Sequence, residues 1–565
     1  MPNRRVISGV IATVIVALVA VVAIVLAAPK ASQSTRPKSA AGPAGTSAGT
    51  SAGTSAGTSA GTSAGTVAGA ASGPATFAGP DGMQARWVIA ENDKPGTTAW
   101  KIHGSHAGIS GFASQVYAQA GQRVTLYVST TGPSFRAEAF RMGYYHDRGA
   151  RLIWTSPAET GKNQPGCPVK PGVNMVACDN WSPSLTFTVT PAFVQGDYLI
   201  KLTGPGNRQS YVPLTIWDPA STATYVIKND VFTWQAWNFY GGYDYYQGLG
   251  NCPPDVYPVC NRARVVSYDR PYAAENGSGN FLGLEYPLVE WAEQHGLDVT
   301  YATDLTVQER PGYLLEHKVL LSLGHDECWS LAERQAAVAA YNRGTNIVFF
   351  AASPVLRHVR TQTSPLGADR ELVDYRDSAA DPLNGHGNPL QVTGNEWSNP
   401  PSSWPEYDFV GDTYAGFLEP GLHVGFRVAD ASAWVFAGTG LHNGEVIPSL
   451  IASDVDKFDE GYGQPANDQI FGHSPIPARL GQTSIGAFFS DMTYYTNSST
   501  GAGVLDSGTN NWIPALDGRS GCRPGGVCEA TVVQRMTGNI LRLFGQGPAA
   551  TIQPSVPNWR QVTSQ

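Results

Sequence analysis

The stretch Lys318-Val-Leu-Leu-Ser-Leu-Gly-His-Asp-Glu-Cys-Trp-Ser330 decides the fold of the central part of this chain. Its first half is a short apolar run that ends at a glycine, which predicts a buried strand. From residue 331 to residue 341, Ala, Glu, Arg and Val recur at helical spacing and predict a helix. His325, Asp326 and Glu327 are therefore expected on the turn between a strand and a helix.

This turn carries an imidazole and two carboxylates, which are groups that transfer protons or bind metals. In open α/β sheets, ligands bind in the crevice beyond the carboxyl ends of the strands. Asp326 and Ser330 have an alternative role, because Asp and Ser before a helix often only cap its first turn. His325 and Glu327 are not needed as caps, so we regard them as the stronger site candidates.

Predicted strands and helices alternate around this stretch. Strands are expected at residues 224–227, 298–301, 319–322 and 346–350, and helices at residues 281–295 and 331–343. This alternation indicates a doubly wound, mostly parallel sheet, and we assign residues 219–547 to an α/β domain. After residue 351 the chain is rich in Pro and Gly, with a predicted strand at 433–437 and a closing helix at 530–544. Residues 548–565 form a C-terminal tail.

Residues 77–218 have a different pattern, in which short runs of β-forming residues are separated by turn residues. These runs lie at residues 123–129, 135–141, 185–190 and 196–202. The alternation within the runs and their regular spacing predict an antiparallel β-sandwich. The expected fold is therefore a β-sandwich followed by an α/β domain.

The N-terminal region has the features of an export signal. An uncharged, almost wholly apolar run from Val6 to Ala28 is long enough to cross a bilayer. The arginines before it favour an amino terminus in the cytoplasm, with the rest of the chain exported. We predict a transmembrane signal anchor at residues 1–28, with a cleaved signal peptide as the alternative. A low-complexity Ala/Gly/Thr/Ser stalk follows at residues 29–76, so the folded domains are expected on the extracytoplasmic side of the cell membrane.

The net charge of -8 on 565 residues and the absence of a basic stripe exclude nucleic acid as a partner. Six of the seven cysteines form close pairs, which are expected disulfides of an exported protein. The pairs are Cys167–Cys178, Cys252–Cys260 and Cys522–Cys528. Cys328 is left over, and it is either a nucleophile or a small buried apolar residue. The oligomeric state is left open.

Aromatic residues follow two other predicted strands. Because the loops after parallel strands converge at one edge of the sheet, these residues are expected to face the His325 turn across one pocket. The candidates for the pocket wall are Trp234, Trp237, Tyr240 and Tyr246. Tyr268, Glu327 and His325 offer a phenolate, a carboxylate and an imidazole, which a hard Lewis-acid ion such as ferric iron accepts. The spacing of these residues alone does not define a metal site.

Several segments carry a more specific combination of residues. They are Phe140-Arg-Met-Gly-Tyr-Tyr-His-Asp-Arg-Gly-Ala-Arg151, Thr233-Trp-Gln-Ala-Trp-Asn238, Ser267-Tyr-Asp-Arg-Pro271 and Leu321-Ser-Leu-Gly-His-Asp-Glu-Cys-Trp-Ser330. With them, the chain resembles the C-terminal domain family of the N,N-dimethylformamidase large (beta) subunit. The resemblance implies a β-sandwich followed by an α/β domain similar to class I glutamine amidotransferases. It also implies hydrolysis of a small amide at a mononuclear iron held by two tyrosines and a glutamate.

The resemblance assigns site residues position by position. Glu327 matches the metal-binding glutamate, and His325 matches the histidine beside it. Tyr268 is the match for one metal-binding tyrosine. The other tyrosine falls in the Thr-Trp-Gln-Ala-Trp-Asn segment, where this chain has tryptophans, and an indole cannot ligate iron. Tyr240 and Tyr246 in the adjacent loop are the alternatives.

Three functions are compatible with these features. The first is a metal-dependent hydrolase of small amides, in which Glu327 and Tyr268 hold the ion and His325 or Asp326 moves the proton. The second is a non-catalytic cell-surface module that has lost a metal ligand and binds a glycan or another envelope component. The third is a thiol hydrolase that uses Cys328.

Overall fold

The computed structural model describes residues 75–250, 261–483, 488–517 and 529–564. The predicted anchor, the stalk up to residue 74 and the cysteine pairs Cys252–Cys260 and Cys522–Cys528 lie outside these ranges. Within them, no helix combines the length and the apolar character needed to cross a bilayer. The described part is a mixed α/β structure that is rich in strands and has several sheets.

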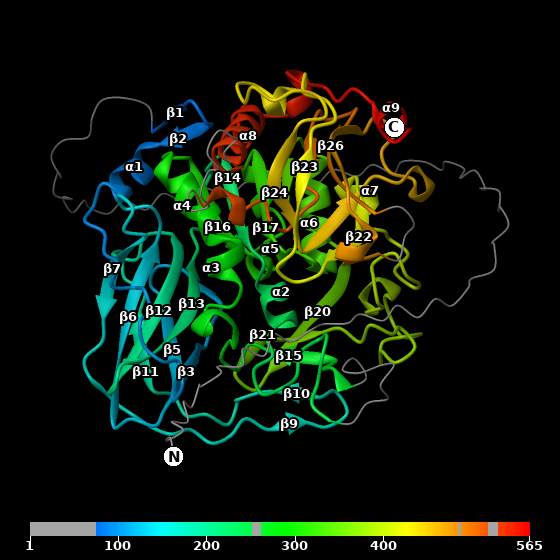
Figure 1. Cartoon of the computed structure of the whole chain (residues 1–565). Coiled ribbons are helices and arrows are strands. Elements are labelled where there is room, and N and C mark those ends of the chain that lie inside the picture. The colour runs from blue at the N-terminus through cyan, green and yellow to red at the C-terminus, as the bar shows by residue number, and fades with distance from the viewer. Residues whose placement is uncertain (1–74, 251–260, 484–487, 518–528, 565) are drawn as a thin grey trace, which may run out of the picture. The chain divides into compact units, whose positions relative to one another are not determined.

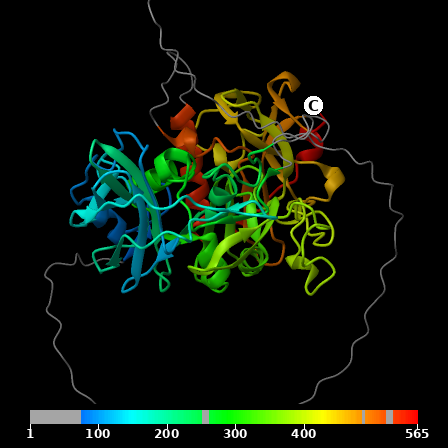
Figure 2. The ribbon, with the colours of Figure 1, turned by 90° about the horizontal axis from the view of Figure 1, so that it is seen from below.

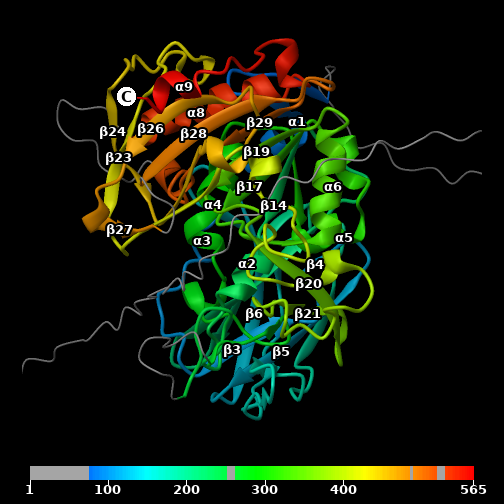
Figure 3. The same ribbon diagram turned by 90° about the vertical axis from the view of Figure 1, so that its right-hand side faces the viewer.

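A seven-stranded sheet forms the centre of the α/β part, with the strand order β16-β14-β17-β19-β29-β28-β26 (Figure 3). The strands are β16 (Val299–Thr303), β14 (Tyr225–Asn229), β17 (Val319–Gly324), β19 (Asn346–Ala351), β29 (Gly503–Asp506), β28 (Phe489–Thr496) and β26 (Gln469–Pro475). The first five are parallel, and the last two join antiparallel. The four strands predicted in this region are all present.

Both faces of this sheet are covered by helices, as expected for a doubly wound sheet. On one face, side chains such as Leu321 pack against α4 (Tyr286–Gln294) and α8 (Glu529–Phe544). On the other face, side chains such as Leu320 pack against α5 (Asp304–Glu309) and α6 (Leu331–Tyr341). Successive residues of β17 point to opposite layers, so its whole apolar run is buried.

The helix predicted at residues 281–295 is interrupted. It consists of α3 (Phe281–Leu284) and α4, which are separated at Glu285. The buried carboxylate of Glu285 accepts hydrogen bonds from Nδ2 of Asn229 at 2.7 Å and Nε1 of Trp234 at 2.6 Å. These bonds to the β14 region hold Glu285 outside helical geometry.

The strand predicted at residues 433–437 is wrong. The segment forms a 3-10 turn at Trp434–Phe436, with Val435 and Phe436 buried in the apolar layer that includes α8. Nδ2 of Asn539 on α8 donates to the carbonyls of Val435 and Ala437, at 2.9 and 2.8 Å. Because the helix satisfies these carbonyls, the segment needs no neighbouring strand.

The N-terminal part contains two facing sheets, in blue and cyan in Figure 1. Their apolar side chains share one core. One sheet has β11 (Leu185–Thr188), β5 (Arg123–Thr130) and β3 (Ile109–Ala113), and the other has β4 (Tyr117–Ala118), β13 (Arg208–Ile216), β12 (Gly196–Gly204), β6 (Ser134–Met142) and β7 (Ala150–Thr155). All pairs except the short β4–β13 pair are antiparallel, so the predicted β-sandwich is present.

The sandwich lies beside the α/β part (Figure 2). Buried polar contacts join the two parts. Arg141 on β6 forms a fully buried ion pair with Glu293 on α4, with Nη2 2.5 Å from Oε1. The hydroxyl of Tyr301 on β16 donates to the same Glu293 oxygen at 2.6 Å. Further along, Met175 and Ala177 from a long sandwich connection pack against Val265 of β15 (Val265–Ser267).

Candidate functional site

The turn after β17 has the geometry that the sequence predicted. Gly324 has a φ of +57°, and a Cβ added there would lie 2.6 Å from the carbonyl oxygen of Leu284, so a larger residue does not fit. His325, Asp326 and Glu327 follow on this turn. A short strand that was not predicted, β18 (Cys328–Ser330), separates them from α6. Ser330 is the N-cap of α6, so capping accounts for this residue.

His325 lies between two carboxylates. Its Nε2 is 3.3 Å from Oε2 of Glu327 and 3.1 Å from Oδ2 of Asp454. Asp454 begins β25 (Asp454–Lys457), which pairs with β22 (Thr413–Leu418). The three side chains are mostly buried, and they place one nitrogen and two oxygen atoms close enough together to hold a metal ion. No local pattern in the sequence points to Asp454.

The carboxyl group of Glu327 is in an environment that favours its protonated form. Burial raises the pKa of Glu327 to about 7, against the opposing effect of Arg357, and Asp454 raises it further. Arg376 lowers this pKa and Asp374 raises it, because both side chains also interact with Glu327. A carboxyl with a pKa near neutrality can both accept and release a proton.

Trp237 and Tyr246 lie beside His325. The Trp237 ring is 5.5 Å from the His325 ring, and it stacks on Tyr246 with a centroid distance of 3.8 Å. The guanidinium of Arg376 covers the Tyr246 ring at 4.6 Å. These two predicted pocket residues therefore form an aromatic wall next to the candidate metal ligands.

Asp326 has different partners. Its Oδ2 accepts a hydrogen bond from Oγ of Ser322 at 2.7 Å and lies 2.8 Å from Nζ of Lys228. Lys228 is fully buried and also pairs with Asp304 and with Glu333. The structure therefore gives Asp326 a role in a buried ion-pair network, and its predicted role in proton transfer stays a prediction.

Tyr268, the predicted phenolate ligand, also has a different contact. Its hydroxyl donates to the main-chain carbonyl of Val231 at 3.1 Å. Its side chain lines a small cavity together with Trp234 and Tyr272. A bond from Tyr268 to a metal would require this hydrogen bond to break, and its role as a ligand stays a prediction.

A tyrosine that the sequence did not suggest is coupled to the site. Tyr414 on β22 interacts electrostatically with Asp454, Arg357 and Glu327. Burial and the nearby Asp454 carboxylate raise the pKa of Tyr414 well above its usual value. Tyr240 packs instead with Phe112 and Trp181 of the sandwich and its disulfide loop. Tyr414 and Tyr246 are thus the phenols that the structure associates with this turn.

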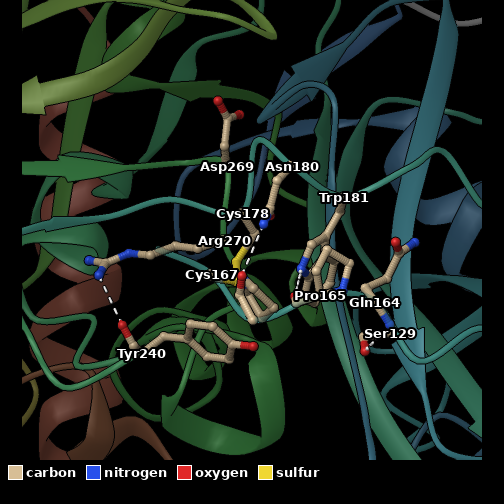
Figure 4. Close-up of a disulfide and its surroundings, with 12 residues drawn as sticks. Ser129, Gln164, Pro165, Cys167, Cys178, Asn180, Trp181, Tyr240, Asp269 and Arg270 are labelled. Carbon is tan, nitrogen blue, oxygen red and sulfur yellow. Dashed lines mark hydrogen bonds between the residues drawn. A yellow bond between two sulfur atoms is a disulfide. The ribbon is translucent and has the colours of Figure 1, made fainter. Parts of the chain in front are cut away.

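The Cys167–Cys178 disulfide is present, as predicted, with a Cα–Cα distance of 4.5 Å (Figure 4). The main-chain N–H of Cys178 donates to the carbonyl of Asp269 at 2.6 Å. The next residue, Arg270, donates from Nη1 to the carbonyl of Tyr240 at 3.1 Å. The disulfide loop therefore supports the segment that follows Tyr268.

Cys328 is a buried free thiol. Burial raises its pKa well above the usual value, and the neighbouring Glu327 carboxylate raises it further. Its Sγ lies 3.9 Å from Oε1 of Glu327. A neutral thiol is a poor nucleophile, so these surroundings do not favour the thiol-hydrolase hypothesis.

More than half of this chain matches the model of one protein family. The model of the family described as N,N-dimethylformamidase beta subunit-like, C-terminal, matches residues 136–525. This chain belongs to that family. The match runs from β6 through the central sheet and includes His325, Glu327, Tyr414 and Asp454. A search of curated proteins finds no match.

Solved structures show only partial similarity to this N,N-dimethylformamidase beta subunit-like chain. An uncharacterized Bacillus anthracis protein aligns at 12% identity over 19% of this chain and 84% of its own, with a TM-score of 0.13. A Paenibacillus cycloisomaltooligosaccharide glucanotransferase aligns at 12% identity over 24% of this chain and 18% of its own, with a TM-score of 0.14. Murine CEACAM1b aligns at 13% identity over 22% and 62%, with a TM-score of 0.11.

Proposed function

We propose that this member of the N,N-dimethylformamidase beta subunit-like family is a metal-dependent hydrolase of small amides. The observation that carries the proposal is the meeting of His325, Glu327 and Asp454 around one point. An imidazole and two carboxylates are suitable ligands for iron and other first-row metals.

A second observation also supports a metal ion at His325, Glu327 and Asp454. Nε2 of His325 has no hydrogen-bond partner of acceptable geometry in the described part of the chain, although two carboxylate oxygens lie within 3.3 Å. A buried polar atom without such a partner is costly unless something else satisfies it. His325, Glu327 and Asp454 would hold the ion. When bound, a metal ion polarises a carbonyl and lowers the pKa of a water molecule.

The other residues of the site have roles that follow from their contacts. Glu327 would hold the ion as a carboxylate, so binding of the ion would displace the proton that the buried surroundings of Glu327 favour. Trp237 and Tyr246 would form one apolar wall of the substrate pocket and exclude bulk water. Arg357 and Arg376 offset the negative charge of the carboxylates.

The proposal also includes the predicted class I glutamine amidotransferase-like fold and the predicted extracytoplasmic location. The parallel order β16-β14-β17-β19-β29, with the site on the turn after β17, supports a class I glutamine amidotransferase-like fold. The disulfide supports an extracytoplasmic location. The single-pass N-terminal anchor is proposed from the apolar run at residues 6–28. The substrate would be a linear amide small enough for a mostly buried site.

A surface module without catalysis is the second candidate function. The observation that favours it is a groove with polar and aromatic walls between the sandwich and the α/β part. Its lining includes His106, Ser110, Asn163, Tyr240, Tyr272 and Asn276. Such a surface suits a glycan or another envelope component, because aromatic faces stack on sugar rings while amides and hydroxyls bind sugar hydroxyls.

Metal analysis combined with an amide-hydrolysis assay separates the two functions. The full-length protein is expected to contain a first-row metal and to release amine from small linear amides. The conservative variant Glu327→Gln should lose both properties, whereas Glu419→Gln, away from the site, should keep both. Metal-free protein that binds oligosaccharide and hydrolyses no amide would favour the surface module and reject the hydrolase.

A further inference from the structure

Arg270, on the segment that follows β15, is a buried arginine with unbonded donors. The residue is 1% exposed. Its Nη1 donates to the main-chain carbonyls of Tyr240 at 3.1 Å and Tyr243 at 3.0 Å. Its Nε and Nη2 atoms are buried, and neither has a hydrogen-bond partner in the described part of the chain. The chain therefore holds the guanidinium in place but leaves two of its nitrogen atoms unbonded.

The carboxylates near Arg270 are bonded to other groups. Asp269 pairs with Arg370, and Figure 4 shows the Asp269 carboxylate and the Arg270 guanidinium pointing in different directions. Asp244 interacts electrostatically with Arg270, but its Oδ1 accepts bonds from two main-chain N–H groups of its own loop, at 2.8 and 2.7 Å. Burial lowers the pKa of Arg270 to about 10, against the opposing effect of Asp244. Arg270 is therefore still charged at neutral pH.

Two other buried arginines have a carboxylate partner. Arg141 is paired with Glu293, and Arg370 is paired with Asp269. A buried charge is costly unless an opposite charge or hydrogen bonds compensate it. The two carbonyls bonded to Nη1 compensate the charge of Arg270 only in part, so an anion from outside the chain would stabilise this side chain.

Arg270 lines a small cavity. The cavity has a volume of about 30 Å³, which is room for about two water-sized groups. Its wall is largely apolar and includes Phe112, Leu214 and Trp234. Arg370 also lines it, but the guanidinium of Arg370 is bonded to Asp269 and to main-chain carbonyls. Arg270 is thus a charged lining residue whose donors are still available.

The positions of the two unbonded nitrogen atoms favour a carboxylate. Nε and Nη2 lie along one edge of the planar guanidinium, where their N–H bonds are parallel. The two oxygen atoms of a carboxylate accept both bonds at once, and such paired bonds are strong and specific in geometry. The volume of the cavity restricts the rest of the ligand to a few atoms.

We propose that Arg270 binds a small carboxylate, such as formate, in this cavity through Nε and Nη2. The bonds from Nη1 hold the guanidinium in place before the ligand arrives, which lowers the cost of binding. Tyr272 lines both this cavity and the groove between the sandwich and the α/β part, so the ligand would enter from the groove past this ring. The site does not involve His325, Glu327 or Asp454, and the inference does not depend on amide hydrolysis.

A trapped water molecule is the competing explanation. Oε1 of Gln115, another lining residue, is a buried acceptor without a hydrogen-bond partner among the described residues. One water molecule could donate to Gln115 and accept from Arg270. It would bring no negative charge, so the charge of Arg270 would stay uncompensated. The two explanations therefore differ in whether an added carboxylate stabilises the protein.

A formate titration of the full-length wild-type protein is the first test. In a buffer without other carboxylates, added sodium formate should raise the melting temperature in a saturable way by about 3 °C. Sodium chloride at the same concentration should raise it less, and so should benzoate, which is too large for the cavity. Binding of isotope-labelled formate, measured by NMR, should saturate over the same range. No saturable effect of formate, or an equal effect of chloride, would overturn the proposal.

Variants provide the second test. Arg270→Lys keeps the positive charge but loses the two parallel donors, and it should bind formate about 10-fold more weakly. The matched control Gln115→Leu alters the wall of the same cavity and should bind formate as the wild type does. Glu327→Gln should also bind it, so failure of the hydrolase proposal is separate from failure of this one. An unchanged affinity for formate in Arg270→Lys would exclude Arg270 as the binding residue.

Discussion

Nε2 of His325 lies 3.1 Å from Oδ2 of Asp454, although the two residues come from distant parts of the sequence. His325 is on the turn after a parallel strand of the central sheet, and Asp454 is on a strand of a smaller sheet. The site is therefore built where two sheets meet. We therefore expect Asp454, the carboxylate from the second sheet, to be as important to the proposed function as Glu327.

Replacing Asp454 tests this relationship directly. Asp454→Asn keeps the shape of the side chain but removes the negative charge of one proposed ligand. We expect amide hydrolysis to fall by about 100-fold or more, with weaker metal retention on dialysis. The matched control is Asp459→Asn, just after the same strand, where the aspartate is partly exposed and pairs with Lys457. Full activity and metal content in Asp454→Asn would remove this residue from the site.

Tyrosine variants distinguish Tyr414 from Tyr268, the phenol that the family resemblance assigns to the metal. A phenolate bound to ferric iron gives visible absorption. Because Tyr414 is coupled to Glu327 and Asp454, we expect Tyr414→Phe to abolish this absorption in iron-loaded protein. Tyr268→Phe should leave it, because the Tyr268 hydroxyl is bonded to the Val231 carbonyl. The reverse result would establish Tyr268 as the ligand and exclude Tyr414.

The buried ion pair between Arg141 and Glu293 should be important for stability. Arg141→Ala leaves the Glu293 carboxylate buried without its main partner. We expect the free energy of unfolding to fall by about 3–5 kcal/mol, measured by urea denaturation. Arg136→Ala, at an exposed position of the same strand, should change it by about 0.5 kcal/mol or less. Equal stability of the two variants would show that this contact is energetically neutral.

Asp197 should make stability depend on pH. Burial raises the pKa of Asp197 to about 7, while the unfolded chain titrates near 4. The folded state therefore holds this proton more tightly, and the resulting stabilisation is present below pH 4 and is lost as the pH rises to 7. We compare the free energy of unfolding of the wild type with that of Asp197→Asn. The difference, wild type minus variant, should fall by about 4 kcal/mol between pH 4 and pH 7. A flat difference would mean that Asp197 is ionised in the folded protein.

The elements that could be predicted from the sequence are those whose residue pattern is local. The strands of the central sheet near His325 are continuous apolar runs that end at turn residues, and the α6 region has regular helical spacing. The His325–Glu327 turn follows directly from these two elements. The Cys167–Cys178 pairing was also predictable, because the two cysteines are close in the sequence.

The parts that could not be predicted depend on contacts between distant residues. The strands β28 and β29 complete the central sheet from a region that is rich in Gly and Pro, so their pairing is not encoded in a local period. Asp454 and Tyr414 reach the site only through such pairing. The segment at 433–437 has a strand-like composition, but Asn539 from a distant helix binds its carbonyls.

The sandwich connection that carries Met175 and Ala177 packs on Val265 of the α/β part. Cutting or recombining the gene near residue 218 would expose this apolar contact and would leave Glu293 without Arg141. The two halves are therefore not interchangeable modules, and they should be inherited, expressed and engineered as one piece.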